Sequence, residues 1–360
     1  LADDGIDARS VNASLLFEPW TVETKTGGFY RVYTPFWKSV RHRTVARPEP
    51  APAGLSPPGM WPRSDHLDDW CMGESMNRGA AIVARHVRVG EAAARDRLGH
   101  FVSSVIDDYK TGRDLPAKSA TSKLSENLAY GEISARQIWH AGLQALQERG
   151  HPDAAETFLK EIVWREFAYH LLFHSPQIET GNWRGKWDQF PWREDSTDAE
   201  AWRRGQTGIE MVDAAMREMY VTGTMHNRTR MLAASFLTKH LLTHWRVGEA
   251  WFRDCLVDWD VASNAMGWQW VAGSGPDAAP YFRIFNPDTQ ADKFDRRGVY
   301  RDRWIAEGRA SPHPDGLSFF DAIPRSWRRD PTSPYPSPVI SLALGRERAL
   351  EAYSTRVAAE

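Results

Sequence analysis

The sequence predicts a mainly α-helical protein in which a short remnant of an α/β domain precedes one large helical domain. Apolar residues recur at three- and four-residue steps through most of the chain from Ile82 onward, as on the buried face of an amphipathic helix. Strand signals are scarce after residue 20. We therefore expect the α/β remnant at 1–30, a proline-rich linker at 31–72 and the helical domain at 73–360.

Length and composition indicate a globular protein without a strong overall charge. A chain of 360 residues can bury a large core. Because its formal net charge is only −2, any binding to nucleic acid has to come from a local basic patch. Two cysteines, Cys71 and Cys255, give no disulfide framework and fit a reducing cytosol, so a cytoplasmic protein is predicted. No apolar run reaches the roughly eighteen residues of a membrane span.

The N-terminal part is expected to contain little regular structure. Residues 1–20 are predicted to hold the end of a helix and a short strand at Ser14–Phe17. Thr34 followed by Pro35 predicts a helix start, because a threonine N-cap with proline at the first helical position is favoured. From residue 44 to residue 62, six prolines and two glycines exclude regular structure and predict an extended segment.

Helix boundaries can be predicted along the remainder of the chain. Ser134 and Gln137 form a capping-box signal for a helix that runs to Gly150. Residues 177–207 are too rich in glycine, proline and charge to predict a helix. The other helices predicted from the apolar pattern and its start and stop residues are 82–87, 92–109, 152–175, 208–220, the first half of 224–270, a helix ending near Leu256, and a closing helix.

Residues 224–270 combine a helical pattern with an unusual density of polar and indole side chains. Asn227, Arg230 and Met231 are spaced by three and four residues, so they share one helix face. Two acids, an amide and two tryptophans follow within thirteen residues: Asp258, Asp260, Asn264, Trp268 and Trp270. This combination predicts a pocket for a flat ligand with a polar edge.

The motifs of this region resemble the FAD-binding domain of the photolyase and cryptochrome family. They are MHNRTRM at 225–231, DWDVASN at 258–264, GWQW at 267–270 and DAAPYFRIFNPDTQADKFD at 277–295, in this order. The resemblance is closest to class I photolyases for cyclobutane pyrimidine dimers. It implies an all-helical FAD-binding domain, with residues 1–30 as the end of an α/β antenna domain. An antenna chromophore such as a folate or a deazaflavin would bind a site that is largely missing here.

The resemblance also implies which residues bind FAD. Alone, TSKLS at 121–125 is an ordinary capped loop; in the family it holds the pyrophosphate, and hydroxyls beside free backbone N–H groups suit an anion. Asp258 would pair with Arg230, and Asn264 would face the flavin N5, where photolyases have Asn and cryptochromes usually Asp or Cys. The expected FAD-binding residues are Tyr109, Thr121, Ser122, Lys123, Leu124, Ser125, Phe158, Arg165, Arg230, Asp258, Asp260 and Asn264.

The segment EIVWREF at 161–167 resembles the family segment that contacts the damaged pyrimidines. By itself it would be interpreted as a solvated Glu–Arg pair beside a core tryptophan. The resemblance instead makes Glu161 and Asn227 catalytic and assigns electron transfer to Trp268, Trp245 and Trp192, which packing alone could also explain. The residues expected to contact the lesion or DNA are Arg113, Glu161, Trp164, Asn227, Arg228, Met231, Trp270, Arg283 and Gln290, with Lys293 as a further phosphate contact.

The function implied is light-driven repair of pyrimidine dimers in DNA by reduced FAD. The protein is expected to be a bacterial-type monomer that associates with the nucleoid when bound to DNA, without a membrane or metal partner. Two His-x3-His pairs have metal-ligand spacing but lack a third ligand. The main alternative is a blue-light photoreceptor, which we disfavour because no C-terminal tail follows the closing helix. Repair of (6-4) lesions is disfavoured because His226 is followed by Asn227, and non-catalytic DNA binding leaves the flavin residues unexplained.

Overall fold

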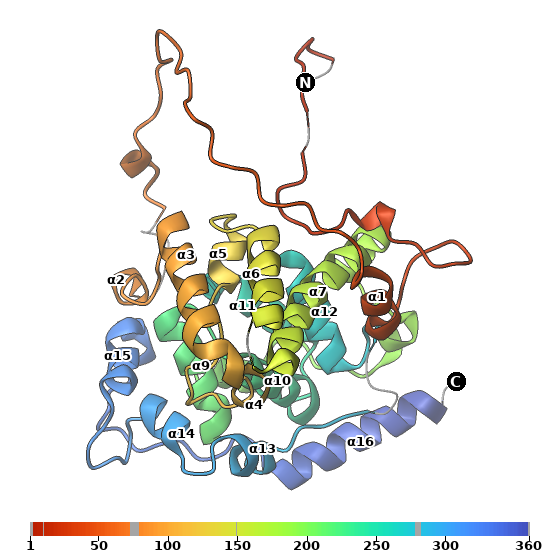
Figure 1. Ribbon diagram of the computed structural model, residues 1–360. Helices are drawn as coiled ribbons and strands as arrows, with labels where there is room; N and C mark the ends of the chain where they lie inside the picture. Colours follow the sequence, from red (N-terminus) through yellow and green to blue (C-terminus); the bar gives the residue numbers. More distant parts are fainter. Residues whose placement is uncertain (1–2, 10, 73–78, 149, 278–281, 359–360) are drawn as a thin grey trace.

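Helices make up the regular structure of the described chain, apart from one isolated bridge between Arg193 and Thr243 (Figure 1). The structure, a computed structural model, describes residues 3–9, 11–72, 79–148, 150–277 and 282–358. The α-helices are α1 (Tyr33–Val40), α2 (Ala80–Val83), α3 (Glu91–His100), α4 (Tyr109–Gly112), α5 (Ser125–Ala129), α6 (Ala135–Glu148), α7 (Pro152–His174), α8 (Thr197–Arg203), α9 (Glu210–Thr222), α10 (Asn227–Ser235), α11 (Trp245–Cys255), α12 (Val261–Ala272), α13 (Pro287–Phe294), α14 (Val299–Trp304), α15 (Pro314–Ala322) and α16 (Leu342–Ala358). Two π-helical segments, Phe101–Val105 and Phe236–His240, continue α3 and α10.

The helix α7, 23 residues long, lies in the middle of the molecule (Figure 1). It packs along α6 and against α12, and α12 in turn contacts α10 and α11. One core of buried side chains is built mainly on α9, α10 and α11, and a second on α6, α7 and the N-terminal segment. The helix α12 borders both, because Trp268 belongs to the first core and Met266 packs against the second.

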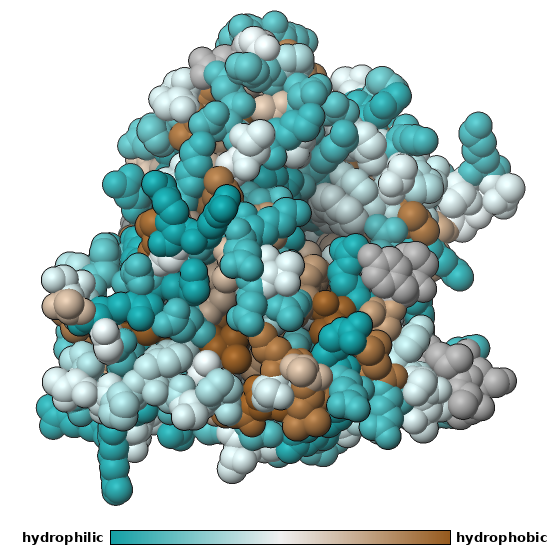
Figure 2. Space-filling view, turned by 90° about the horizontal axis from the view of Figure 1, so that it is seen from below, coloured by the Kyte–Doolittle hydropathy of each residue, from teal (hydrophilic) through white to brown (hydrophobic). Residues whose placement is uncertain are grey.

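An extended segment projects from one side of the molecule, and the closing helix covers the opposite side. Residues 44–62 extend away from the helices, as their prolines predict, while α16 runs along the opposite side (Figure 1). Figure 2 views that opposite side and shows a mainly hydrophilic face with apolar side chains gathered near its middle. Within the described ranges, no helix is both long enough and apolar enough to cross a membrane.

Several predicted helix ends are confirmed. The Ser134 amide donates to Gln137 Oε1 at 2.9 Å and the Gln137 amide donates to Ser134 Oγ at 3.2 Å, which is the predicted capping box. Gly223 ends α9 with φ +71°, and a Cβ there would lie 2.6 Å from Val257 Cγ1. The cap predicted at Thr34 is wrong: α1 begins at Tyr33, two residues before the predicted first helical residue Pro35, with Val32 as its N-cap and no side-chain capping bond.

The strand predicted at Ser14–Phe17 is absent; these residues are irregular, although helices are the main structure as predicted. Instead of a neighbouring strand, a carboxylate accepts their backbone donors: Leu16 N and Phe17 N donate to Glu166 Oε2 at 2.7 and 3.1 Å. Tyr30 N donates to His170 Nε2 at 3.0 Å. The N-terminal segment is thus held on α7 by two buried side chains, a pairing that apolar periodicity could not predict.

We expect the stability of this attachment to depend on pH through Glu166. Burial raises the pKa of Glu166 to about 7, from 4.5, against the lowering effect of the Phe17 N–H, Arg165 and the Leu16 N–H. The folded state therefore binds the proton more tightly than the unfolded state, and this stabilisation is complete below pH 4.5 and lost as the pH rises to about 7. Relative to Glu166→Gln, the wild type should lose up to about 3 kcal/mol of unfolding free energy across this window.

Urea denaturation of both proteins at a series of pH values measures that difference. Glu156→Gln, which removes a half-exposed carboxylate paired with Lys160 on the same helix, is the matched control and should show no such trend. A pH-independent difference between wild type and Glu166→Gln would contradict the prediction.

The prediction that 177–207 contains no helix is wrong over 197–203, where α8 forms. Ser196 caps this helix by accepting a hydrogen bond from Ala199 N at 3.3 Å. Trp202 is completely buried and its indole N–H donates to Ala233 O of α10 at 3.0 Å. Tertiary burial of one tryptophan and a good N-cap therefore outweigh a composition that is unfavourable to helices.

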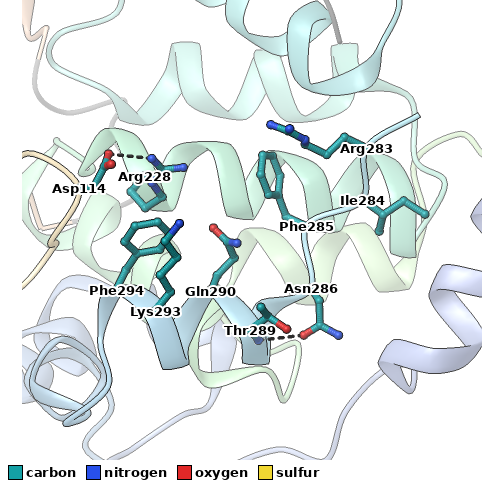
Figure 3. Close-up of a pocket in the computed structure, with 10 residues that line it drawn as sticks. All are labelled: Asp114, Arg228, Arg283, Ile284, Phe285, Asn286, Thr289, Gln290, Lys293 and Phe294. Atoms are coloured by element: carbon teal, nitrogen blue, oxygen red, sulfur yellow. Dashed lines mark hydrogen bonds and ion pairs between the residues drawn. The ribbon is translucent and has the colours of Figure 1, made fainter. Parts of the chain in front are cut away.

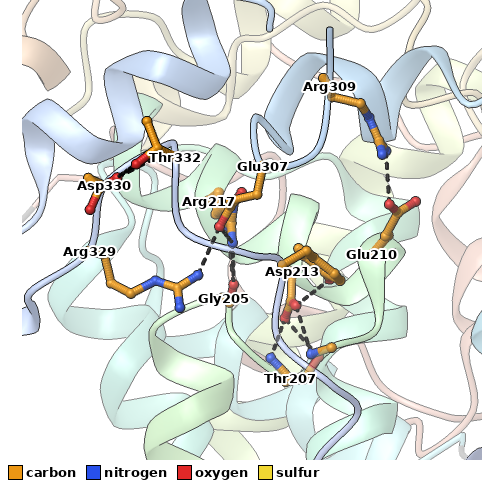
Figure 4. A network of polar contacts seen from close by, with 12 residues as sticks. Gly205, Thr207, Glu210, Asp213, Arg217, Glu307, Arg309, Arg329, Asp330 and Thr332 are labelled. Carbon is orange, nitrogen blue, oxygen red and sulfur yellow. Dashed lines mark hydrogen bonds and ion pairs between the residues drawn. The ribbon is translucent and has the colours of Figure 1, made fainter.

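A buried polar network attaches the segment after α14 to α9 (Figure 4). Arg217 and Glu307 form a two-pronged ion pair, with N–O distances of 2.6 and 3.0 Å, and both side chains are fully buried. Arg329 donates to the same carboxylate at 2.9 Å. Beside it, Asp213 accepts from Thr207 N and from the Tyr335 hydroxyl. Burial alone would raise the pKa of Glu307, but the hydrogen bonds from its arginine partners lower it, so the carboxylate stays charged.

Glu307→Gln is expected to destabilise the protein by about 3–5 kcal/mol, because it leaves a buried guanidinium without its counter-charge. Chemical denaturation, followed by circular dichroism, measures the loss. The control is Glu91→Gln, which breaks an exposed pair with Arg95 and should cost at most about 1 kcal/mol. An equally small effect of both substitutions would contradict the importance assigned to this network.

Candidate functional site

A cavity of about 170 Å³ opens between α10, α11 and α12. Each helix contributes one face to it, and the loop before α12 contributes two carboxylates. Its lining comprises Asn227, Arg230, Met231, Ala234, Phe252, Asp258, Asp260, Ser263, Asn264, Gly267, Trp268 and Val271. The structure therefore brings together most of the residues that the 224–270 region predicted for one pocket. Trp270 is not part of this lining.

Arg230 and Asp258 form the predicted pair at one edge of the cavity. Arg230 Nη2 donates to both carboxylate oxygens of Asp258, at 2.7 and 2.9 Å, and its Nε donates to Met225 O at 2.7 Å. The Asp258 side chain is almost completely buried, whereas that of Arg230 is one-quarter exposed. Three hydrogen bonds thus fix the guanidinium at the wall, with its charge balanced.

Asp260 has two structural partners in addition to its place in the lining. Its Oδ1 caps α12 by accepting from Ser263 N at 2.8 Å, and its Oδ2 accepts from the Tyr169 hydroxyl at 2.5 Å. Burial, with the Asp260 carboxylate close by, raises the pKa of Tyr169, so the phenol stays protonated as a donor. Arg165 lies 4.9 Å from the Tyr169 ring centroid and donates to Ser14 O, so it stands behind the cavity and does not line it.

Trp268 forms the inner wall of the cavity and is 3% exposed. It packs edge-on against Phe252 at 4.8 Å between ring centroids. A Cβ at Gly248 would collide with the indole ring, so glycine allows Trp268 to lie directly on the backbone of α11. Trp245 stands three residues before Gly248 on the same helix, which brings the first two predicted relay residues to neighbouring positions.

His244, which no motif marked as part of the predicted relay, lies between Trp245 and Trp192. Trp245 is fully buried, and its indole N–H donates to Asn182 Oδ1 at 2.9 Å. The His244 ring lies 5.5 Å from the Trp245 ring and 5.3 Å from that of Trp192. Burial lowers the pKa of His244 to about 4, so the imidazole is neutral at neutral pH. Trp192 is half-buried and packs on Phe190 at 4.5 Å.

The predicted lesion residues outside the cavity have partners of their own. Glu161 accepts a hydrogen bond from Arg113 Nη1 at 2.5 Å. Trp164 is stacked on Tyr33 of α1, with ring centroids 3.6 Å apart and planes 7° from parallel. Trp270 donates to the backbone oxygen of Asp277, next to residues 278–281, which lie outside the described chain. The described residues do not gather Glu161, Trp164 and Trp270 into the cavity that contains Asn227 and Met231.

The remaining predicted FAD contacts also lie off this cavity. Tyr109 and Phe158 pack edge to face at 5.5 Å within the α7 core. In the 121–125 loop, Lys123 has φ +52° and its carbonyl accepts from Arg97 at 2.9 Å. Leu124 is the N-cap of α5 and makes no side-chain capping bond, so the first amides of that helix have no side-chain cap. The loop does not border the 170 Å³ cavity, and its role in binding the pyrophosphate stays a prediction.

A second cavity, of about 420 Å³, is lined by the predicted DNA contacts (Figure 3). Arg228 comes from α10, Gln290 and Lys293 from α13, and Arg283 from the segment before α13. The other lining residues are Asp114, Ile284, Phe285, Asn286, Thr289 and Phe294. Three cationic side chains face a single carboxylate here, which favours an anionic ligand.

Among the described residues, no group of three or more His, Cys, Asp or Glu side chains is arranged to hold a metal ion. The members of the two His-x3-His pairs have other contacts: His170 accepts from Tyr30 N, His174 stacks on Phe29 at 4.9 Å, and His240 stacks on Phe236 at 5.1 Å.

Comparison with known proteins connects this geometry to one family. The model for the FAD binding domain of DNA photolyase matches residues 158–355, and the DNA photolyase model matches 1–55. The Agrobacterium fabrum protein named deoxyribodipyrimidine photo-lyase is 46% identical over 359 residues, which are 98% of this chain and 74% of that protein. A bacterial class III photolyase from Agrobacterium tumefaciens aligns with a TM-score of 0.87 at 44% identity, over 99% of this chain and 74% of the other. The cryptochrome of Synechocystis sp. PCC6803 aligns with a TM-score of 0.73 at 29% identity, over 94% and 71%.

Proposed function

We propose, from the premise that this chain belongs to the photolyase and cryptochrome family, that it is a deoxyribodipyrimidine photolyase, an enzyme that repairs cyclobutane pyrimidine dimers in DNA with light. One observation supports this most strongly. Arg230 of α10, Asp258 of the loop before α12 and Asn264 of α12 line one cavity together with a buried tryptophan. The matched FAD-binding domain covers these same helices.

The residues around the 170 Å³ cavity fit the ring system of a flavin. The ring is flat, and hydrogen-bond donors and acceptors follow one of its edges. Asp260 and Asn264 offer acceptors and an amide donor to such an edge, and Arg230 offers a fixed guanidinium. The indole N–H of Trp268 is buried in this wall and has no hydrogen-bond partner within the described residues. When bound in its reduced form, FAD supplies the photoexcited electron that opens the cyclobutane ring and receives it back.

On the protein side, the polar residues at the cavity orient and stabilise, and none has to act as a general base. Asp260 is fixed by Ser263 N and by the Tyr169 hydroxyl, so its carboxylate cannot rotate away from the wall. The amide of Asn227 would donate to a pyrimidine carbonyl, and the carboxylate of Glu161 would accept from a ring N–H. The hydrogen bond from the Asn227 amide would stabilise negative charge on that carbonyl as the ring opens, and the hydrogen bond to the Glu161 carboxylate would orient the pyrimidine.

The three tryptophans would carry electrons from the surface to the cavity. Trp268 lies in the cavity wall against Gly248 of α11, Trp245 stands three residues before Gly248 on that helix, and His244 lies between Trp245 and the half-buried Trp192. Ring contacts therefore connect Trp192 to Trp245 through His244, and α11 connects Trp245 to the cavity wall. This path serves to bring the flavin to its reduced state and is not needed once it is reduced.

The 420 Å³ cavity of Figure 3 would bind the phosphates of the damaged strand. Arg228, Arg283 and Lys293 supply positive charge, and Gln290 supplies an amide, from elements that meet only in the fold. Because the overall charge is −2, this local concentration of cations is what the proposal requires for DNA binding.

Irradiation of dimer-containing DNA tests the proposal. The purified protein, reconstituted with FAD and reduced, is mixed with an oligonucleotide that carries one thymine dimer, in blue light and in the dark. We expect monomeric thymines only in light. The alternative of a photoreceptor, suggested by the cryptochrome alignment, predicts no repair in either condition, while a sample with oxidised flavin is still photoreduced in light. That outcome would overturn the proposed function.

A further inference from the structure

The single carboxylate in the cationic cavity belongs to Asp114, which no sequence motif singled out. Asp114 Oδ1 accepts a hydrogen bond from Arg228 Nη2 at 2.7 Å, and the two form an ion pair (Figure 3). The Arg228 side chain is 20% exposed and that of Asp114 is 41% exposed. The strongest candidate phosphate contact is therefore already neutralised in part before any DNA arrives.

In the described part of the chain, no neighbouring cation other than Arg228 forms a hydrogen-bonded ion pair with the Asp114 carboxylate. Arg113, the adjacent cation, is engaged with Glu161 and is absent from the cavity lining. His226 is the nearest imidazole that Asp114 influences, but burial lowers the pKa of His226 to about 4, so it carries no charge at neutral pH. Asp114 also interacts electrostatically with Arg113, but its hydrogen-bonded ion pair is with Arg228.

Arg228 does not depend on Asp114 alone for its position. Its guanidinium carbon lies 4.4 Å from the centroid of the Phe294 ring, in a cation–π contact. Its backbone N–H donates to His226 Nδ1 at the start of α10. The Phe294 ring holds the Arg228 side chain over the cavity, and the hydrogen bond at the helix start fixes its backbone. A substitution at residue 114 can therefore remove the charge of Asp114 while Arg228 keeps its orientation.

We propose that Asp114 limits the affinity of this enzyme for DNA by competing with backbone phosphate for Arg228. A phosphate that approaches Arg228 also approaches the Asp114 carboxylate, which repels it, and it must share the guanidinium with that carboxylate. The inference rests on the proposed DNA-binding role of this cavity. Its consequence is that removal of one charge at residue 114 strengthens binding, whereas loss of most other side chains from the cavity weakens it.

Asp114→Asn tests this, because asparagine keeps the shape and an acceptor oxygen for Arg228 but removes the charge. Fluorescence anisotropy with a labelled undamaged duplex measures affinity at low salt and at roughly physiological salt. We expect Asp114→Asn to bind about fivefold more tightly at low salt, equivalent to about 1 kcal/mol. The gain should shrink as salt screens the repulsion, which a merely structural effect would not do. Asp108→Asn, which breaks an exposed pair with Lys118 outside the cavity, should leave affinity unchanged.

A double-mutant cycle with Arg228→Ala separates the failure of this inference from the failure of the proposed function. Arg228→Ala alone should weaken DNA binding and reduce its salt dependence, and Asp114→Asn should give a clearly smaller gain in that background, where only direct repulsion of the phosphate is relieved. If Asp114→Asn binds DNA no better than wild type, or if its gain is undiminished without Arg228, the inference is overturned while the phosphate site stands. If Arg228→Ala leaves affinity unchanged, the phosphate site itself is overturned, and the inference with it.

Discussion

Glu161→Ala combined with Asn227→Ala is expected to lower the rate of dimer repair by roughly a thousandfold, since removal of one preset hydrogen-bonding group costs about a hundredfold to a thousandfold in comparable sites. Photoreduction of the flavin should continue, because the Trp268 relay is intact. The measurement is repair of dimer-containing DNA by the pre-reduced protein, beside photoreduction in the same preparation.

The control for this double variant comes from the same helix. Glu156, five residues before Glu161, has a half-exposed carboxylate that pairs with Lys160. Repair by Glu156→Ala should be unaffected. Repair by the double variant at the wild-type rate would show that the pyrimidines bind elsewhere. Loss of FAD together with repair would show that the two residues support the flavin and not the lesion.

Trp268→Phe is expected to give the opposite pattern. Phenylalanine preserves packing against Phe252 but is much harder to oxidise than an indole, so it stops the relay at its first step. Photoreduction of oxidised flavin should fall below detection, whereas enzyme reduced chemically beforehand should repair dimers at nearly the wild-type rate. Transient absorption after a laser flash, with a repair assay on the same sample, measures both.

A matched control shows that the effect depends on position. Trp304→Phe alters another buried tryptophan, on α14, which lies outside the cavity lining and should leave photoreduction intact. If Trp268→Phe abolishes repair by the pre-reduced enzyme as well, Trp268 acts on the lesion or on flavin binding, and the relay assignment fails.

The helical fold and the FAD-binding domain could be predicted from the sequence because both depend on local pattern. Apolar periodicity gave the positions of α7 and α9, and the ordered motifs of 225–295 gave the family, which is confirmed. The pairing of Arg230 with Asp258 was also predictable, because the family resemblance carries that contact with the motif. Residues 177–207 were mispredicted because composition does not show that Trp202 will be buried against α10.

Side chains that orient the site could not be predicted in the same way. Tyr169 reaches Asp260 across 91 residues of sequence, Tyr33 reaches Trp164 across 131, and Asp114 reaches Arg228 across 114. Each is an ordinary residue in its own segment and acquires its role only when two helices meet. His244 is similar, because its place between two indoles depends on the return of the chain from Trp192 to α11.

Gly248 carries no side chain, yet it decides how closely the proposed relay can approach α11. Because no Cβ separates Trp268 from the backbone of α11, the indole lies directly on the helix that carries Trp245. The probability of electron tunnelling decays exponentially with the distance between donor and acceptor. A methyl group at residue 248 would push the Trp268 indole away from α11 and so slow the transfer. In the proposed relay, the rate of electron transfer therefore depends in part on the absence of a side chain at residue 248.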